Sequence, residues 1–237
     1  MESIVSVVIP TYNGAAYIRE TLDSVLGQTY RPLEILVVDD GSTDGTGDAV
    51  AAYAPHVTLI AQSRQGHPAA RNRGVQSATG DFLSFLDHDD LWAPDKIETQ
   101  LACFLRDPAL DLVFGHIRNF FTAEMSEADR RLVAVPLRPL PGLLQGAMLA
   151  RRTAFHRVGP FSQQLDMGDF LDWYGRATTL GLKTHILPDV VLHRRIHAAN
   201  FTRTHGHLRK QYLPAVKQLL DRRRAAAAQE PKGEGKL

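Results

Sequence analysis

A cluster of acidic residues closes one apolar run of the sequence, FLSFLDHDD. The residues that follow the run without a break are Asp87, His88, Asp89 and Asp90. Like charges this close raise one another's pKa and destabilise a fold unless a cation or hydrogen bonds compensate them. Alternate residues of an extended segment project to the same side, which places Asp87 and Asp89 to share a divalent cation with a nucleotide diphosphate. The alternative is a solvated turn, and in both cases Asp90 is expected to cap a helix that begins near residues 92–94.

A second acidic pair, Asp39 and Asp40, stands in the sequence VVDDGSTDGT. A carboxylate at a strand end can accept hydrogen bonds from a nucleobase imide or a ribose, and the glycine that follows lets a backbone approach closely. The same segment also makes an ordinary turn, with Ser42 or Asp44 as the capping group of a helix. No GxxxxGK pattern occurs and no GxGxxG follows the first strand, so the usual NTPase and dinucleotide signatures are missing.

A scaffold must hold these polar residues in place. In the first third of the chain, strand-like apolar runs alternate with segments whose apolar residues have helical spacing. The patterns predict strands at 4–9, 33–38, 57–61 and 82–86, and helices at 17–26, 48–53 and 69–78. That order is typical of parallel strands joined by crossover helices, in which ligands bind beyond the carboxyl ends of the strands. We therefore expect residues 10–13, 39–42 and 87–90 to gather at one edge of the sheet.

The second half of the chain is less regular. Its patterns predict helices at 95–105, 150–158 and 172–180, strands at 110–119 and 183–192, and a mixed loop region at 121–145. We expect one α/β domain over residues 1–208, with a central, mostly parallel sheet flanked by helices. Residues 209–237 are expected to form a basic helix that leads into a disordered tail.

Composition excludes several classes of protein. The chain has 237 residues, 44% of them hydrophobic, and a formal net charge of +1, which is ordinary for a globular protein and offers no strong field for nucleic acid. The single cysteine, Cys103, rules out an internal disulfide framework and a cysteine-rich zinc site, and it favours a reducing, cytoplasmic location. No stretch reaches the ~20 apolar residues of a membrane span. Peripheral association with a membrane stays open.

Four segments, in order, resemble the successive motifs of glycosyltransferase family 2, a group with the GT-A fold. They are VSVVIPTYNGAAYIRETLDSVLGQTY, ILVVDDGSTDGT, AARNRG and GDFLSFLDHDDLWAPDKIETQ. In the second half GAMLARRTAFHRVGPF and RRIHAAN fit more weakly. The resemblance implies a GT-A domain with a nucleotide-sugar-binding half at 1–100 and an acceptor half at 101–208.

The activity that the resemblance implies is inverting transfer of a sugar from a nucleotide-diphosphate sugar, with UDP favoured and Mg²⁺ or Mn²⁺ neutralising the leaving diphosphate. The acceptor would be a saccharide, a lipid-linked saccharide or a peptide. Carried over by position, the donor-site residues would be Pro10, Thr11, Tyr12, Asp39, Asp40, Arg71, Asp87 and His88. The metal ligands would be Asp87, Asp89 and His197, with Asp89 the more direct one, and the phosphates would be screened by Arg194, Arg195 or Arg203.

An inverting transfer also needs a base that takes the proton of the acceptor. In the family this base is an acidic residue of a Glu-Asp pair, and the segment FSQQLDMGDFLDWYGRATTLG places Asp169 on the Glu and Phe170 on the Asp. Phe170 departs from the family pattern, so Asp169 is only slightly favoured as the base. Asp172 is the alternative base and Asp166 is a third choice. Asp169 and Asp172 could instead only cap the helix that follows. Trp173 is expected either to stack on an acceptor sugar or to pack in the core.

Two other functions compete with this interpretation. A sugar-phosphate nucleotidyltransferase can share the sheet and a metal-binding carboxylate. It would need a Gly-rich loop with Arg and Lys after the first strand, which PTYNGAAY lacks. A degenerate nucleotide-binding module without turnover is favoured only by the substituted Glu-Asp site.

Overall fold

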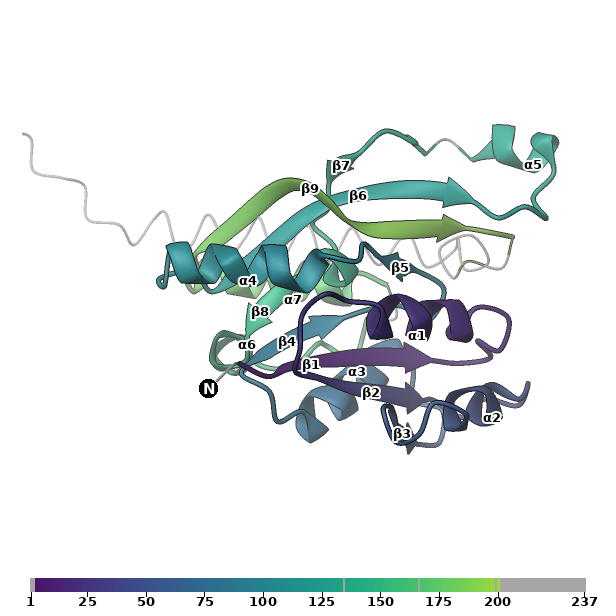
Figure 1. Ribbon diagram of the computed structural model, residues 1–237, viewed down its shortest axis with the longest axis horizontal. Coiled ribbons are helices and arrows are strands. Elements are labelled where there is room, and N and C mark those ends of the chain that lie inside the picture. The colour runs from purple at the N-terminus through teal and green to yellow at the C-terminus, as the bar shows by residue number, and fades with distance from the viewer. Residues whose placement is uncertain (1–2, 134, 166, 199, 201–237) are drawn as a thin grey trace, which may run out of the picture.

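The computed structural model describes residues 3–133, 135–165, 167–198 and 200 (Figure 1). The expected tail at 209–237, Asp166 and Arg203 therefore lie outside the described residues. The strands are β1 (Val5–Thr11), β2 (Leu33–Asp39), β3 (Thr58–Ala61), β4 (Phe82–Phe85), β5 (Leu91–Trp92), β6 (Leu112–Phe121), β7 (Leu140–Pro141), β8 (Leu149–Arg151) and β9 (Thr184–Ile196). The helices are α1 (Ile18–Leu26), α2 (Thr46–Ala51), α3 (His67–Ser77), α4 (Lys96–Arg106), α5 (Glu127–Leu132), the 3₁₀ turn η1 (Gln145–Ala147), α6 (Arg152–Val158) and α7 (Asp169–Thr179).

In the described part of the chain the strands form one nine-stranded sheet in the order β3-β2-β1-β4-β8-β6-β9-β5, with β7 paired to β6 (Figure 1). β1 runs parallel to β2 and to β4, and β2 runs parallel to β3, which confirms the parallel first half. The register pairs Thr11 with Asp39, so two of the polar clusters begin side by side. Beyond β4 the sheet is mixed, because β8 is antiparallel to both β4 and β6 whereas β6 and β9 are parallel.

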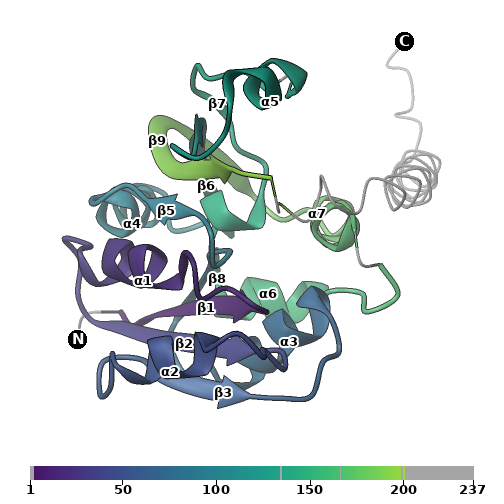
Figure 2. The same cartoon turned by 90° about the vertical axis from the view of Figure 1, so that its right-hand side faces the viewer.

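Helices cover both faces of the sheet, because the side chains of each strand alternate between the faces. On one face Val5, Val7 and Ile9 of β1 pack with apolar residues of α1, α2 and α4. On the other face Val8 and Phe85 pack with residues of α3, α6 and α7. Figure 2 shows α1 and α4 over the same face of the strands. The domain thus has three layers.

Helix α3 packs closely on β1 with a face of mainly small and apolar residues that also carries Arg71. A Cβ atom on Gly74 would lie 2.3 Å from Cγ1 of Val8, so only glycine allows this approach. Arg71 lies one turn earlier on the same helix and is buried. The packing of α3 therefore carries a guanidinium group toward the end of β4.

Three parts of the second half differ from the expected elements. Residues 149–151 form β8, where the pattern predicts the start of a helix, because they pair with both β4 and β6. The region 121–145 contains α5 and β7 rather than only loop. Helix α7 begins at Asp169 and not at Asp172, directly after Gly168, which has a φ of 95°. Pairing in the sheet and a left-handed glycine thus override the local periodicity.

The described helices include none with both the length and the apolar character needed to cross a bilayer. Cys103 is a buried free cysteine of α4. The cytoplasmic location that the cysteine count favours remains a prediction.

Candidate active site

The three polar clusters meet at the carboxyl ends of the strands. The backbone N–H of Asp40 donates to the carbonyl oxygen of Thr11 at 2.9 Å, which joins the first two clusters. The third cluster reaches the first because Gly14 packs against the ring of His88. A Cβ atom on Gly14 would lie 2.5 Å from Cδ2 of His88. Glycine at this position therefore lets the loop before α1 approach the acidic segment.

A buried arginine connects two acidic residues that are far apart in the sequence. Nη2 of Arg71 donates to Oδ1 of Asp87 at 2.9 Å, and Nη1 donates to Oδ2 of Asp169 at 2.7 Å. Burial lowers the pKa of Arg71, but the carboxylates of Asp169 and Asp87 outweigh this effect and raise it. Burial raises the pKa of Asp169 against the opposing effect of Arg71. The buried guanidinium thus joins one half-buried carboxylate of the acidic segment to one buried base candidate.

Asp89, the second carboxylate of the DxD pattern, faces the residues that follow β9. Its Oδ2 lies 3.0 Å from Nε2 of His197 and 3.2 Å from Nδ2 of Asn200. Burial acts to raise the pKa of Asp89, but the hydrogen bond from His197 and the nearby His88 lower it below the ordinary value. The structure therefore brings Asp89 and His197 together, with the carboxylate held in its ionised form.

Arg195 ties the acidic segment to α1 and β9. Its backbone N–H donates to Oδ1 of Asp90 at 2.8 Å, its Nε donates to the carbonyl oxygen of Asp89 at 2.8 Å, and its Nη2 pairs with Glu20 at 2.7 Å. Helix α4 begins at Lys96, well after the acidic segment. The prediction that Asp90 caps a helix is therefore wrong. Arg195 is engaged within the fold, and the choice among Arg194, Arg195 and Arg203 for screening phosphates remains a prediction.

Asp90 explains how the fold tolerates three adjacent carboxylates. Burial raises its pKa well above the ordinary value, and the charges of Asp89 and Asp87 add to this effect. The other two carboxylates of the segment have partners of their own, because Asp87 pairs with Arg71 and Asp89 lies in hydrogen-bond contact with His197.

The second acidic pair also has bonds within the fold. Asp40 accepts hydrogen bonds from three N–H donors of the 62–66 loop, each at 2.8 Å. Asp39 accepts from the backbone N–H of Ser42 at 2.9 Å and from its hydroxyl at 2.5 Å. These contacts match the turn interpretation that the sequence leaves open. Each carboxylate oxygen has more than one lone pair, so the role of Asp40 toward a nucleobase remains a prediction.

Two buried polar atoms near Gly14 lack a hydrogen-bond partner within the described residues. They are Oγ1 of Thr11 and Nδ1 of His88. A buried polar group without a partner destabilises a fold, so such atoms indicate where a ligand or a water completes the bonding. Beside them Pro10 is buried and Tyr12 is half-buried. The predicted donor-site residues of β1 and of the acidic segment therefore border one place where ligand contacts are missing.

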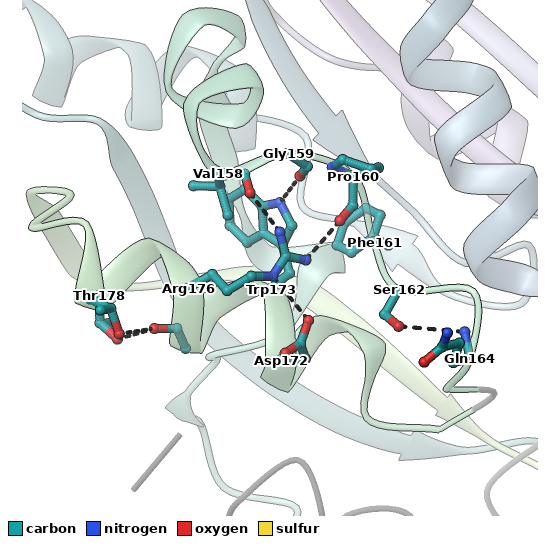
Figure 3. Close-up of polar contacts among 12 residues, drawn as sticks. Val158, Gly159, Pro160, Phe161, Ser162, Gln164, Asp172, Trp173, Arg176 and Thr178 are labelled. Carbon is teal, nitrogen blue, oxygen red and sulfur yellow. Dashed lines mark hydrogen bonds and ion pairs between the residues drawn. The ribbon is translucent and has the colours of Figure 1, made fainter. Parts of the chain in front are cut away.

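Asp172 belongs to a different part of the structure from Asp169. Its Oδ2 accepts from Nε of Arg176 at 3.0 Å, and the same guanidinium donates to the carbonyl oxygens of Val158 and Pro160 at 2.6 and 2.7 Å (Figure 3). This ion pair ties α7 to the turn after α6. Although Asp169 and Asp172 are three residues apart on one helix, Asp169 joins the Arg71 network and Asp172 supports a loop.

Trp173 lies in the core. Its side chain is 0% exposed and packs on the ring of Phe155, with 5.0 Å between the ring centroids. Its indole N–H donates to the carbonyl oxygen of Gly159 at 2.9 Å (Figure 3). No ring face is open to a sugar, so the prediction that Trp173 stacks on an acceptor is wrong and its packing alternative is right.

Gln145 and Asn200 join the site although no motif singled them out. Nε2 of Gln145 donates to Oδ2 of Asp87 at 3.2 Å, and Nδ2 of Asn200 donates to Asp89. Asn200 is the last residue of the segment RRIHAAN. This segment resembles a family motif, and that resemblance could have indicated that Asn200 belongs to the site. Gln145 stands in a region without periodicity, so nothing in the sequence pointed to it.

The donor atoms for a metal ion are only partly assembled. Among the residues that the structure describes, no three His, Cys, Asp or Glu side chains converge to hold an ion. The predicted set of Asp87, Asp89 and His197 is not formed, because Asp87 turns to Arg71 and Gln145. Asp89 and His197 adjoin each other, however, and a carboxylate oxygen beside an imidazole nitrogen suits one divalent cation whose other ligands are phosphate oxygens.

Comparison with known proteins finds relatives of this chain among glycosyltransferases. The family model described as glycosyl transferase family 2 matches residues 6–162. An uncharacterized glycosyltransferase of Rickettsia typhi is 29% identical over 212 residues, which cover 85% of this chain and 66% of that protein. The uncharacterized glycosyltransferase YibD of Escherichia coli is 41% identical over 105 residues, covering 43% of this chain and 30% of YibD. The match with this chain thus spans less than two thirds of the length of these relatives.

A solved structure shares the fold. The crystal structure of S. aureus TarS 1–349 in complex with UDP-GlcNAc has a TM-score of 0.69 and 20% sequence identity, and the match covers 92% of this chain and 66% of that chain. At this identity the likeness concerns the fold. It confirms the single-domain α/β architecture expected from the sequence.

Proposed function

The chain belongs to glycosyl transferase family 2, and we propose that it transfers a sugar from a UDP-linked donor to an acceptor with inversion at the anomeric carbon. The observation that carries this proposal is the buried arginine bridge between Asp87 and Asp169. An inverting transfer needs one group beside the leaving diphosphate and a second group that accepts the proton of the acceptor on the opposite face of the sugar. The bridge holds Asp169, the base candidate, in one network with Asp87 of the acidic segment, whose Asp89 is the residue we place beside the diphosphate.

Contacts near the end of β1 support a UDP-sugar as the donor. S. aureus TarS, which shares the fold, has been crystallised with UDP-GlcNAc. Here the ring of Tyr12 offers a flat face, which the guanidinium of Arg64 now covers at 3.5 Å from the ring centroid. A uracil ring could stack on Tyr12 in the place of Arg64, and we assign the contact with its imide N–H to Asp40. The unpartnered Oγ1 of Thr11 would gain a ligand contact.

We assign a divalent cation, Mg²⁺ or Mn²⁺, to Asp89 and His197. Their polar atoms lie 3.0 Å apart, and phosphate oxygens of the donor would complete the set of ligands. When bound, the ion would neutralise charge on the leaving diphosphate as a Lewis acid. Asn200, which also contacts Asp89, keeps that carboxylate turned toward His197.

Asp169 is the base in this proposal. Its carboxylate accepts the proton of the acceptor hydroxyl while the hydroxyl oxygen bonds to the anomeric carbon. The bond from that carbon to the diphosphate oxygen breaks at the same time, which releases UDP and inverts the configuration. Burial raises the pKa of Asp169 and so makes it a stronger proton acceptor, while the bond from Arg71 fixes its orientation.

Replacing Asp172 with Asn should separate the two base candidates. The change removes the negative charge that pairs with Arg176. The free energy of unfolding should therefore fall by about 1–3 kcal/mol. The rate of transfer should stay within about threefold of wild type, because Asp172 supports a loop and does not touch the reacting atoms. Urea denaturation and UDP release measure the two effects. A large loss of activity without a loss of stability would contradict this division of roles.

The acceptor is assigned only by class, as a saccharide, a lipid-linked saccharide or a peptide. We assign donor binding mainly to residues 1–100 and acceptor binding to residues 101–208. Asp169 is the first residue of α7, so an acceptor hydroxyl would reach it from the second half. A lipid-linked acceptor would require the protein to work at a membrane surface.

UDP release from UDP-GlcNAc and other UDP-hexoses, with Mn²⁺ and a pool of acceptors, tests the proposed function. We expect release that EDTA abolishes, and a product whose anomeric proton reports inversion by NMR. UDP binding without release from any UDP-sugar would instead identify a nucleotide-binding module without turnover. Failure of UDP, GDP and dTDP to bind would overturn the proposed function altogether.

A further inference from the structure

The 3₁₀ turn η1 is held by a row of buried side-chain donors. The carbonyl groups of Gly146 and Ala147 in the turn, and that of Met148 directly after it, each accept a hydrogen bond from a side chain of another element. Nε1 of Trp92 donates to Gly146 at 3.0 Å, and Nε2 of Gln100 donates to Ala147 at 2.9 Å. The carbonyl of Met148 receives the hydroxyl of Ser84 at 2.6 Å and Nζ of Lys96 at 3.4 Å.

Among these buried donors, Lys96 is the one whose burial destabilises the fold most, because it carries an ammonium group. Its side chain is 0% exposed, and burial is the sole cause that lowers its pKa well below the ordinary value. Nζ donates to Oε1 of Gln100 at 2.8 Å and to Oγ of Ser84 at 2.9 Å, and it lies 4.2 Å from the centroid of the Trp92 ring. Among the described residues no carboxylate forms an ion pair with it. Replacing such a group by an apolar side chain of similar size is often neutral or stabilising, so stability alone does not account for this lysine.

The first residue of the turn reaches the donor site. Nε2 of Gln145 donates to Oδ2 of Asp87 at 3.2 Å, while the other oxygen of that carboxylate accepts from Arg71 at 2.9 Å. With a donor on each oxygen, the plane of the Asp87 carboxylate is fixed. The turn is thus anchored on its carbonyl side and presents one amide to the first carboxylate of the DxD pattern.

We infer that Gln145 is a positioning residue of the donor site, and that the buried donor set of Trp92, Lys96 and Gln100 acts on UDP-sugar binding through it. This inference rests on the proposed function and adds a residue that the motifs of the chain do not include. Gln145 orients Asp87 beside the position of the diphosphate, and the buried donor set keeps the turn from moving away. In this inference the buried lysine helps to hold the turn that carries Gln145, and so it helps to set the orientation of Asp87.

Titration of UDP in the presence of Mn²⁺ tests the inference with Gln145→Ala, Lys96→Met and the double variant. Gln145→Ala should weaken UDP binding about tenfold, because Asp87 loses one of the two donors that fix the orientation of its carboxylate. Lys96→Met should weaken binding about three- to tenfold without lowering the melting temperature. If Lys96 acts through Gln145, the double variant should bind no more weakly than Gln145→Ala alone, because coupled residues are not additive. Gln76→Ala, on an exposed position of α3, is the matched glutamine control.

The outcomes separate this inference from the proposed function. UDP binding by Gln145→Ala equal to that of a functional wild type would overturn the inference alone. Additive losses in the double variant would also overturn it, since they would show that Lys96 acts independently of Gln145. If Lys96→Met fails to fold, Trp92→Phe takes the place of Lys96→Met in the single and double variants. This substitution removes the N–H that donates to the carbonyl oxygen of Gly146. A wild type that binds no UDP would overturn the proposed function and this inference together.

Discussion

Replacing Asp169 with Asn is expected to lower the turnover number for sugar transfer by about 100- to 10,000-fold, the usual contribution of a general base. The amide oxygen of Asn can still accept the hydrogen bond that Arg71 donates to this position at 2.7 Å, so the geometry of the network persists. An amide, however, cannot take up the proton of the acceptor. UDP affinity should therefore stay within about threefold of wild type. Steady-state UDP release and UDP titration measure the two quantities.

The matched control for this prediction is Asp172→Asn, one turn further along α7. It makes the same chemical change in a carboxylate that pairs with Arg176. The pH profile gives a second check. Because burial raises the pKa of Asp169, the wild-type rate should fall as the pH drops through this raised value and the carboxylate becomes protonated. Equal activity of Asp169→Asn and wild type would exclude Asp169 as the base.

Arg71→Met should cause the largest loss of stability, a fall of about 3–5 kcal/mol in the free energy of unfolding, because it leaves the buried carboxylate of Asp169 and the half-buried carboxylate of Asp87 without their partner. Arg71 has a side chain that is 6% exposed and pairs with both Asp87 and Asp169. Equilibrium unfolding in urea measures the loss. The same substitution in the background of Asp169→Asn should cost less, because one of the two stranded charges is then absent.

A fall below about 1 kcal/mol for Arg71→Met would contradict the compensating role of the bridge, since values of that size are typical of exposed ion pairs. An equal loss in both backgrounds would show that Arg71 contributes by packing and not by its charge. Either result would weaken the argument that Asp87 and Asp169 act within one network.

The first half of the fold follows from local sequence. Its strands are continuous apolar runs such as Val5–Thr11, which is buried along its whole length, and its helix α1 repeats Ile18, Leu22 and Val25 at helical spacing. Parallel strands bring their carboxyl ends to one edge, so the meeting of the three polar clusters could also be predicted. Here the local pattern and the tertiary structure agree.

The second half depends on partners that a single sequence does not reveal. The three residues of β8 become a strand only because β4 and β6 flank them, and Trp173 is buried by aromatic residues from other elements. The bond between Arg71 and Asp169 spans 98 positions. The roles of Arg195 and Gln145 rest on similar long-range contacts. Periodicity reports which face of an element is apolar, but it does not report what that face meets.

The central claim is that the acidic segment holds a cation against a nucleotide diphosphate. Calorimetric titration of UDP into wild type and Asp89→Ala, with Mn²⁺ and with EDTA, tests it most directly, with Asp48→Ala on an exposed position of α2 as the matched control. We predict that Mn²⁺ strengthens UDP binding by about 10- to 100-fold in wild type and in Asp48→Ala, and that Asp89→Ala removes this effect. Binding of UDP that is equally strong with EDTA, or that is unchanged by Asp89→Ala, would contradict the claim.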